Sequence, residues 1–393
     1  MFYTRNVYAA LKEHLENKQV TVLTGMRRTG KTTLVKQLMT VSDIRQKIYF
    51  DLERIDNREL FSEKNYENIV FALTQRGMVF SEKILIAIDE IQTVPNLPSV
   101  VKYLYDTYDI KFILTGSSSY YIKNRFNESL SGRKKIFEIY PLTFNELLTF
   151  KDIPYLPTED FTNHLFVQSE YERLKNYYDE YINYGGFPEV VLCPKLSDKK
   201  DFINDVLSSY INLDITSVSD FKTATDCYKL IKLLAVRVGT KLDISKLANV
   251  TGLTRAAVEN YLELFEQSYL IRTIPVTSNS PDREIVKARK VYFLDNGIAS
   301  VSADLSSGSK FENAVFNQLQ AFGDISYYQL KTGNEIDFIL NKEAAFEVKE
   351  AAFDNDLRRL RQLAKNLDIE KCFIIGKNPN AVFEGFLWGG FIF

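Results

Sequence analysis

The sequence predicts an α/β protein whose first part is a parallel β-sheet with helices on both faces. Strand-like and helical patterns alternate over about the first 150 residues, which is the order that parallel sheets require. The run from Ile84 to Ile88 is entirely apolar, as expected of a central strand covered on both faces. We expect strands at Gln19–Leu23, Lys47–Leu52, Ile84–Ile88, Lys111–Thr115 and Lys134–Ile139, and helices at 5–16, Lys31–Met39, Tyr66–Gln75 and Ser99–Tyr108.

The pattern changes after about residue 142. A mainly helical segment rich in tyrosine follows, then three short helices, and finally a helix succeeded by strands. The serine- and glycine-bearing run Asp304–Lys310 is expected to be a linker. We therefore predict an ATPase-like segment, a helical connection, a winged-helix-like segment and a small α/β segment, at residues 1–150, 151–227, 228–303 and 304–393.

The third segment resembles a helix-turn-helix with a hairpin wing. Its recognition helix would be Leu253–Phe265, and its wing would be formed by Ile271–Val276 and Lys290–Leu294. Arg255 is the cation near that helix, whereas Glu259, Glu263 and Glu266 are acidic, and a major-groove reader is normally more basic. The segment either reads DNA or packs between domains through the stripe Val258, Leu262 and Phe265.

The bulk composition limits the classes of function. A net charge of −2 over 393 residues argues against a molecule that attracts nucleic acid over its whole surface. The three cysteines are far apart in the sequence, and there are only two histidines, so a disulfide framework or a histidine metal centre is not expected. The start of the chain lacks a signal-peptide pattern and no long apolar run is present, so we expect a cytoplasmic protein without a membrane partner.

A phosphate-binding loop follows the first strand. Residues 25–32 read Gly-Met-Arg-Arg-Thr-Gly-Lys-Thr and match G-x-x-x-x-G-K-[ST] in full. The glycines let backbone N–H groups point at phosphate oxygens, while Lys31 reaches the β- and γ-phosphates and the Thr32 hydroxyl takes a position on magnesium. The alternative is a glycine turn with an exposed lysine. We expect ATP and Mg²⁺ to bind through Gly25, Met26, Arg27, Arg28, Thr29, Gly30, Lys31, Thr32 and Thr33.

An acidic pair, Asp89 and Glu90, ends the apolar strand. Ligands of open α/β sheets bind at this carboxyl edge. We expect Asp89 to hold magnesium, directly or through water, and Glu90 to polarise the attacking water. The alternative, an ordinary strand that ends in acids, is weak beside a phosphate loop.

Further catalytic candidates lie outside these motifs. Ser117 follows the strand Lys111–Thr115, and its hydroxyl either contacts the γ-phosphate or water or only shapes the turn. Arg133 either stabilises the transferring phosphoryl group, in cis or across a subunit contact, or is a surface arginine. Arg27 and Arg28 either contact phosphate or are solvated.

Together these motifs resemble those of AAA-type P-loop ATPases of bacteria and archaea that carry a C-terminal domain of uncharacterised function. The matching segments cover nearly the whole chain, at residues 23–32, 89–92, 114–118, 129–133, 185–188, 293–297, 335–338 and 347–349. The resemblance implies an AAA-like ATPase core, a winged-helix middle and a restriction-endonuclease-like end.

Acids and a lysine recur near the end of the chain. Residues 335–340 and 345–349 read as a hairpin in which polar and apolar side chains alternate. A register that pairs the polar faces would bring Asp337, Glu347 and Lys349 together.

This cluster resembles the D…(D/E)-x-K site of the restriction-endonuclease fold. Asp337 and Glu347 would then bind magnesium, Lys349 would orient water or stabilise the pentavalent phosphate, and Glu312 would be an acid carried on a helix. The alternatives are a half-exposed hairpin with solvated charges, or a vestigial site that binds without cutting.

The sequence thus predicts an ATP-binding and ATP-hydrolysing protein with one of two outputs. In the first, the protein acts on DNA and ATP turnover controls a nuclease-like terminal domain. In the second, it is a nucleotide-dependent switch or scaffold whose terminal domain does not cleave. A homo-oligomer is compatible with either output.

Overall fold

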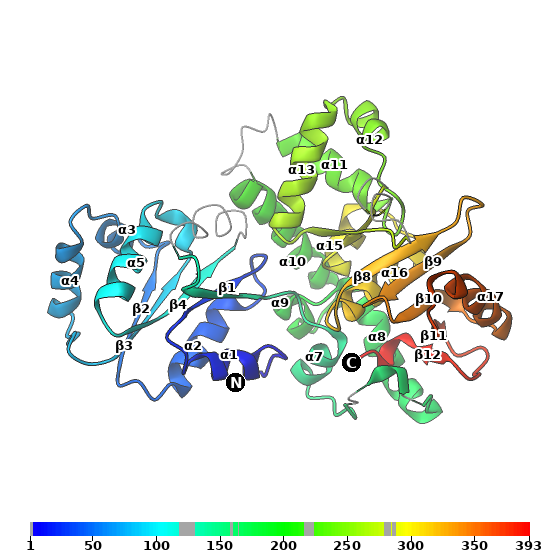
Figure 1. Cartoon of the computed structure of the whole chain (residues 1–393), viewed down its shortest axis with the longest axis horizontal. Coiled ribbons are helices and arrows are strands. Elements are labelled where there is room, and N and C mark those ends of the chain that lie inside the picture. Colours follow the sequence, from blue (N-terminus) through cyan, green and yellow to red (C-terminus); the bar gives the residue numbers. More distant parts are fainter. Residues whose placement is uncertain are drawn as a thin grey trace. The chain divides into compact units, whose positions relative to one another are not determined.

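The computed structural model describes residues 3–117, 130–157, 160–163, 165–215, 224–278, 284 and 288–393. The chain forms two compact units (Figure 1). The N-terminal unit comprises Met1–Tyr140 with Gln267–Tyr269, and the C-terminal unit comprises Pro141–Glu266 with Leu270–Phe393.

A parallel sheet with the strand order β2-β3-β4-β1-β5 forms the centre of the N-terminal unit (Figure 1). Its strands are β1 (Val20–Thr24), β2 (Gln46–Asp51), β3 (Ile84–Asp89), β4 (Ile110–Gly116) and β5 (Lys134–Glu138). Its helices are α1 (Tyr8–His14), α2 (Lys31–Val41), α3 (Ile55–Phe61), α4 (Tyr66–Gln75) and α5 (Leu97–Thr107), with a 3-10 turn η1 (Ile91–Thr93) after β3. The predicted positions are confirmed to within a few residues, and α3 was not predicted.

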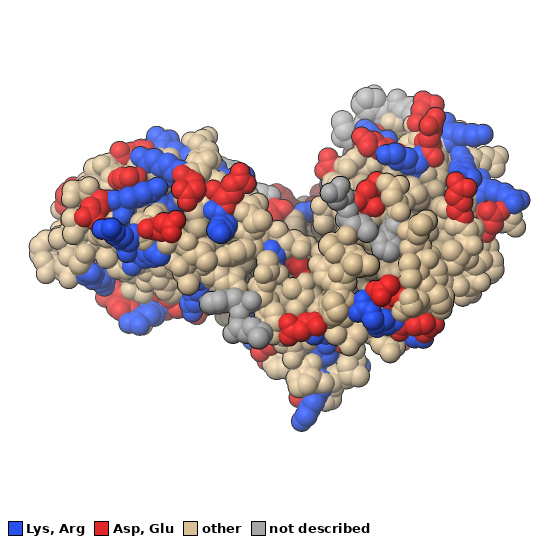
Figure 2. All heavy atoms as spheres, turned by 90° about the horizontal axis from the view of Figure 1, so that it is seen from below, with Lys and Arg blue, Asp and Glu red and all other residues tan. Residues whose placement is uncertain are grey.

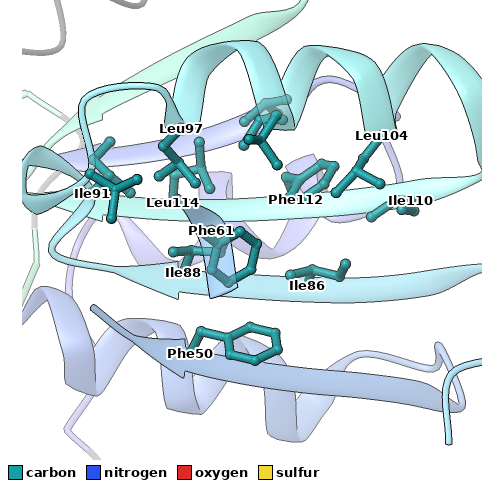
Figure 3. Close-up of a cluster of buried hydrophobic side chains, with 14 of the residues drawn as sticks. Phe50, Phe61, Ile86, Ile88, Ile91, Leu97, Leu104, Ile110, Phe112 and Leu114 are labelled. Carbon is teal, nitrogen blue, oxygen red and sulfur yellow. The ribbon is translucent and has the colours of Figure 1, made fainter. Parts of the chain in front are cut away.

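The interior strand β3 is buried on both of its faces. Successive side chains of a strand point to opposite faces. Ile86 and Ile88 lie in a cluster with Leu97 and other side chains of α5 (Figure 3), whereas Leu85 and Ala87 lie in a second cluster with residues of α1 and α2. The fully apolar sequence of this strand is therefore explained by helices that cover both faces of the sheet.

The middle of the chain is helical. Its helices are α7 (Phe144–Phe150), α8 (Gln168–Tyr184), α9 (Pro188–Leu192), α10 (Leu196–Ser209), α11 (Ala224–Ala235), α12 (Ile244–Thr251) and α13 (Arg255–Gln267), with helical turns η2 (Phe161–Asn163) and η3 (Tyr210–Ile215). Strands β6 (Ile271–Ile274) and β7 (Lys290–Phe293) follow as an antiparallel pair. Three helices and a hairpin were predicted here, and residues 279–282 of the loop between the strands lie outside the described residues. No helix in the described part of the chain is both long and apolar enough to cross a membrane.

A mixed sheet with the order β12-β11-β10-β9-β8 lies near the end of the chain. Strands β8 to β10 are antiparallel and β10 to β12 are parallel. The elements are α15 (Asn296–Ser302), α16 (Ser307–Leu319), β8 (Ile325–Gln329), β9 (Glu335–Leu340), β10 (Ala344–Ala351), α17 (Asp354–Ala364), η4 (Lys365–Leu367), β11 (Lys371–Asn378), β12 (Phe386–Trp388) and η5 (Gly389–Phe391). Helix α16 packs against β10, and α17 packs against β10 and β11.

The prediction of a linker at Asp304–Lys310 is wrong for its second half, because α16 begins at Ser307. The side chain of Ser306 accepts a hydrogen bond from the backbone N–H of Ser309 at 3.1 Å. Serine is a preferred N-cap residue, so the small polar residues that suggested a linker instead start a helix.

A buried polar network joins the segments of the C-terminal unit. The Asp295 carboxylate accepts from the backbone N–H of Gly186 at 2.7 Å, and burial raises the pKa of Asp295 to about 6. Asn296 donates to the carbonyl of Ile182 at 2.9 Å and accepts from Asn313 of α16 at 2.7 Å. The segments predicted at 151–227, 228–303 and 304–393 therefore pack together within one compact unit.

Replacing Gly186 tests this close packing. A Cβ at this position would lie 2.1 Å from the carbonyl oxygen of Leu142. We expect Gly186→Ala to lower the free energy of unfolding of the C-terminal unit by about 2 kcal/mol or more, since the obstacle is backbone. Urea unfolding, followed by circular dichroism, measures this free energy of unfolding.

Gly308→Ala is the matched control, because a Cβ there first meets the tip of Glu350 at 3.7 Å. This variant should be as stable as the wild type or slightly more so. Equal stability of Gly186→Ala and the wild type would contradict the packing described.

Candidate functional site

The loop of residues 25–30 joins β1 to α2 and encloses the end of a lysine side chain. Gly25 has φ +155°, and a Cβ there would lie 2.1 Å from the carbonyl oxygen of Ile139, so only glycine fits. Lys31 is 5% exposed, and its Nζ donates to the carbonyls of Gly25 at 2.8 Å and Met26 at 2.9 Å. The predicted phosphate-binding lysine therefore points back into its own loop.

Asp89 is buried and accepts hydrogen bonds from four groups. Its Oδ2 accepts from the hydroxyls of Thr32 at 2.6 Å and Tyr49 at 2.9 Å. Its Oδ1 accepts from the Thr115 hydroxyl and from the Glu90 backbone N–H at 3.2 Å. Burial raises the pKa of the Tyr49 phenol, and the Asp89 charge adds to that shift, so Tyr49 remains a donor. This carboxylate thus connects the phosphate loop to the carboxyl edge of the sheet.

Glu90 lies beside Asp89 in a left-handed backbone conformation, with φ +57°. Its carboxylate accepts from Gln92, which also donates to the hydroxyl of Ser117 at 3.0 Å. Arg27 lies 3.7 Å from the same carboxylate. Burial raises the pKa of Glu90, and the charges of Lys31 and Arg27 lower it by less than burial raises it. An acid with a raised pKa suits a general base, whose pKa is best near the working pH.

The residues present fit a magnesium ion at the phosphate loop. The Thr32 hydroxyl and the Asp89 carboxylate are oxygen donors in mutual contact, at 2.6 Å. Magnesium takes oxygen ligands and is commonly bound by one or two protein side chains together with phosphates. Of the predicted site residues, the structure brings five to the same edge of the sheet: Lys31, Thr32, Asp89, Glu90 and Ser117.

Arg5 fixes the loop from the N-terminal side and was not predicted. It is buried, and its guanidinium donates to the carbonyl of Thr29 at 2.9 Å and to that of Tyr140 at 2.8 Å. Tyr49, Thr115 and Gln92 were also missed as functional residues. A tyrosine between Ile48 and Phe50 was the signal for the first of these, but the sequence does not show that β2 lies beside β3.

Arg133 is not placed at the phosphate loop. It directly precedes β5, and its carbonyl accepts from the Val20 backbone N–H at 2.8 Å, at the start of β1. The loop follows the other end of β1, about 13 Å away at the usual rise per residue. The Arg133 side chain pairs with Asp106 at 2.9 Å. The predicted cis contact with phosphate is therefore wrong, because a residue before a parallel strand lies at the amino edge.

The second predicted cluster lies on β9 and β10. The strands are antiparallel, and Phe346 pairs with Phe338. Glu347, which follows Phe346, therefore comes close to Asp337, which precedes Phe338. The Asp337 carboxylate accepts from the backbone N–H of Val348 at 2.9 Å. The register predicted for the hairpin is therefore confirmed.

The charged groups around this cluster are buried or half-buried. Lys349 pairs with Glu347 at 2.7 Å. Glu312 of α16 accepts from the Tyr292 hydroxyl at 2.7 Å. Burial raises the pKa of both Glu312 and Glu347 to about 7, and the charge of Asp337 adds to each shift.

A second lysine, which sequence reasoning missed, enters the cluster from β7. The Nζ of Lys290 lies 3.2 Å from Glu335 and 4.0 Å from Asp337. Over the residues that the structure describes, no group of three or more His, Cys, Asp or Glu side chains is arranged to hold a metal ion. The two carboxylates predicted to bind magnesium, Asp337 and Glu347, are each paired with a lysine in this arrangement.

Comparison with known proteins gives matches along most of the chain. Residues 17–148 match a family model described as "AAA domain", and residues 175–309 and 307–385 match two models described as domains of unknown function (DUF8612 and DUF4143). An uncharacterized protein of Methanocaldococcus jannaschii is 27% identical over 370 residues, covering 90% of this chain and 80% of that protein. One of Haemophilus influenzae is 26% identical over 384 residues, covering 91% and 90%.

Among solved structures, the Aeropyrum pernix ORC2 protein in its ADP form matches with 12% identity and a TM-score of 0.39, covering 70% of this chain and 87% of that one. The Aeropyrum pernix ORC1 protein in complex with DNA matches with 13% identity and a TM-score of 0.33, covering 76% and 91%. The match of residues 17–148, together with the parallel sheet and its phosphate loop, supports an AAA-type ATPase in the N-terminal unit.

Removing the Arg133 side chain tests its placement. We expect Arg133→Ala to change ATP turnover by no more than about twofold, because it removes only an exposed ion pair. Steady-state rates at several protein concentrations measure the effect. A loss of about tenfold or more, growing with protein concentration, would instead support a role across a subunit contact.

Proposed function

We propose that this protein binds ATP together with magnesium at residues 25–32 and hydrolyses it. The observation that carries the proposal is the 2.6 Å hydrogen bond between Thr32 and Asp89. It brings the hydroxyl after the phosphate-binding lysine into contact with the acid at the end of β3, which are the two oxygen donors that nucleotide-bound magnesium uses in P-loop proteins. The AAA-domain match of residues 17–148 supports the same conclusion.

Lys31 and the loop backbone bind the phosphates. The Lys31 ammonium exchanges its two loop carbonyl partners, Gly25 and Met26, for oxygens of the β- and γ-phosphates. Thr32 and Asp89 would hold magnesium, which when bound neutralises charge on these phosphates. The hydrogen bonds from Tyr49 and Thr115 orient the Asp89 carboxylate for this role.

Glu90 acts on the attacking water. Its carboxylate takes a proton from the water, whose oxygen bonds to the γ-phosphorus while the bond from that phosphorus to the bridging oxygen of ADP breaks. Gln92 donates to both Glu90 and Ser117, so it positions the base beside the serine that directly follows β4. Ser117 then lies where its hydroxyl meets the γ-phosphate or the water.

For the output, we propose a nucleotide-dependent switch whose C-terminal unit does not cleave DNA. The exposed face of α13 carries Glu259 and Glu263 beside Arg255, an acidic surface that opposes phosphate binding. Figure 2 shows acidic and basic side chains interspersed on one face of the molecule, without a broad basic area. Lys290 and Lys349 engage the carboxylates predicted to bind metal.

DNA cleavage is the second candidate, favoured by one specific observation. Asp337, Glu347 and Lys349 are brought together on adjacent strands, as the D…(D/E)-x-K resemblance implied. The order of strands and helices around them, a helix, three antiparallel strands, a helix and a parallel strand, supports the same resemblance.

Replacing the proposed base tests the ATPase mechanism. Glu90→Gln should bind ATP as the wild type does, while hydrolysis falls by about a hundredfold or more, since the amide cannot accept the water proton. Phosphate release under saturating ATP measures turnover, and calorimetry measures binding.

Glu59→Gln, an exposed acid-to-amide change on α3, serves as the matched control and should keep full turnover. Wild-type turnover in Glu90→Gln would remove Glu90 from the mechanism and leave the binding proposal standing.

A cleavage assay separates the two outputs. With supercoiled and short linear DNA, ATP and magnesium, we expect no cleavage by the wild type, because lysines already neutralise the terminal carboxylates. Gel electrophoresis at several ATP concentrations measures the outcome. Magnesium-dependent nicking that is lost in both Asp337→Ala and Lys349→Ala would establish the second candidate instead.

A further inference from the structure

The carboxylates at the end of the chain are neutralised by a cation that belongs to the chain itself. Together, Glu312, Glu335, Asp337 and Glu347 are called the acid cluster below. We propose that Lys290 occupies, as a built-in cation, the place that a divalent metal ion would take in the acid cluster, so that the folded C-terminal unit binds no metal there. The inference rests on the C-terminal unit alone and does not depend on ATP hydrolysis.

The surroundings of Lys290 are specific for an ammonium group. The side chain is 2% exposed, so its charge has to be balanced by neighbours rather than by water. Its Nζ lies 3.2 Å from Glu335 and 4.0 Å from Asp337, and 5.3 Å from the centre of the Tyr327 ring. Carboxylates and the face of an aromatic ring around the same ammonium group favour an organic cation. Magnesium instead requires a shell of oxygen ligands.

The position of Lys290 is fixed by the strand that carries it. In β7, Lys290 pairs with Ile274, which places it within the β6–β7 hairpin. Two residues further along the strand, on the same face, the Tyr292 hydroxyl donates to Glu312 of the acid cluster. The next backbone N–H, that of Phe293, donates to Asn313 of α16 at 2.8 Å. The hairpin is therefore attached to α16 directly beside the point where its lysine enters.

The remaining predicted metal ligand is also engaged. Glu347 pairs with Lys349 at 2.7 Å, and Asp337 accepts in addition from the backbone N–H of Val348. A divalent ion would have to displace an ammonium group from each of its two predicted carboxylates. This cost distinguishes the acid cluster from the phosphate loop, where Asp89 is held by hydroxyl and N–H donors.

Manganese binding without nucleotide tests the inference, because the phosphate loop lacks the phosphates that complete its metal site. Electron paramagnetic resonance counts bound Mn²⁺ in the full chain. We expect no Mn²⁺ that depends on Asp337 in the wild type, and about one per chain in Lys290→Gln, where the acid cluster has lost its cation. The double variant Lys290→Gln with Asp337→Asn should lose that ion again.

Two further lysine variants sharpen the result. Lys290→Arg keeps the charge and should bind no more Mn²⁺ than the wild type, and Lys342→Gln changes an exposed lysine outside the acid cluster and should do the same. Bound Mn²⁺ in the wild type that disappears in Asp337→Asn would overturn the inference, even if Lys290→Gln fails to fold. A folded Lys290→Gln protein that binds no Mn²⁺ would also overturn it.

Discussion

The N-terminal unit depends on the hydrogen bonds that converge on the buried carboxylate of Asp89. Thr32 reaches it from α2, Tyr49 from β2 and Thr115 from β4. These donors converge only because β2 and β4 flank β3 in a parallel sheet, so that the three strands end at the same edge. A buried ionised acid needs several such donors, and the same donors orient it toward the phosphate loop. Sheet order and loop position thus bring the candidate chemistry together at this one carboxylate.

The C-terminal unit is organised by buried polar contacts of a different kind. Asp295 and Asn296 bind backbone groups of the middle segment and a side chain of α16, so the motifs around residues 185–188 and 293–297 hold the fold together. Lys290 extends this network into the terminal sheet. Hydrogen bonds therefore join residues that a motif-based view assigns to separate domains. Breaking these bonds would cost free energy, because buried donors and acceptors would be left unsatisfied.

Much of the N-terminal unit was predictable because its signals are local in the sequence. The loop at residues 25–32 and the acids after β3 follow from short patterns, and the β9–β10 register follows from alternation. Tyr49, Arg5 and Lys290 could not be found, since their partners lie 40, 24 and 45 residues away respectively and no periodicity links them. The misplacement of Arg133 was avoidable, because strand direction alone puts it at the amino edge.

The central claim is that residues 25–32 with Asp89 form a magnesium-nucleotide site. Calorimetric titration of the wild type with ATP, with and without magnesium, tests it most directly. The account predicts binding of about one ATP per chain that is strengthened by magnesium, and loss of most of the affinity in Lys31→Ala. Equal heats for the wild type and Lys31→Ala, or no binding of ATP by folded wild-type protein, would contradict it.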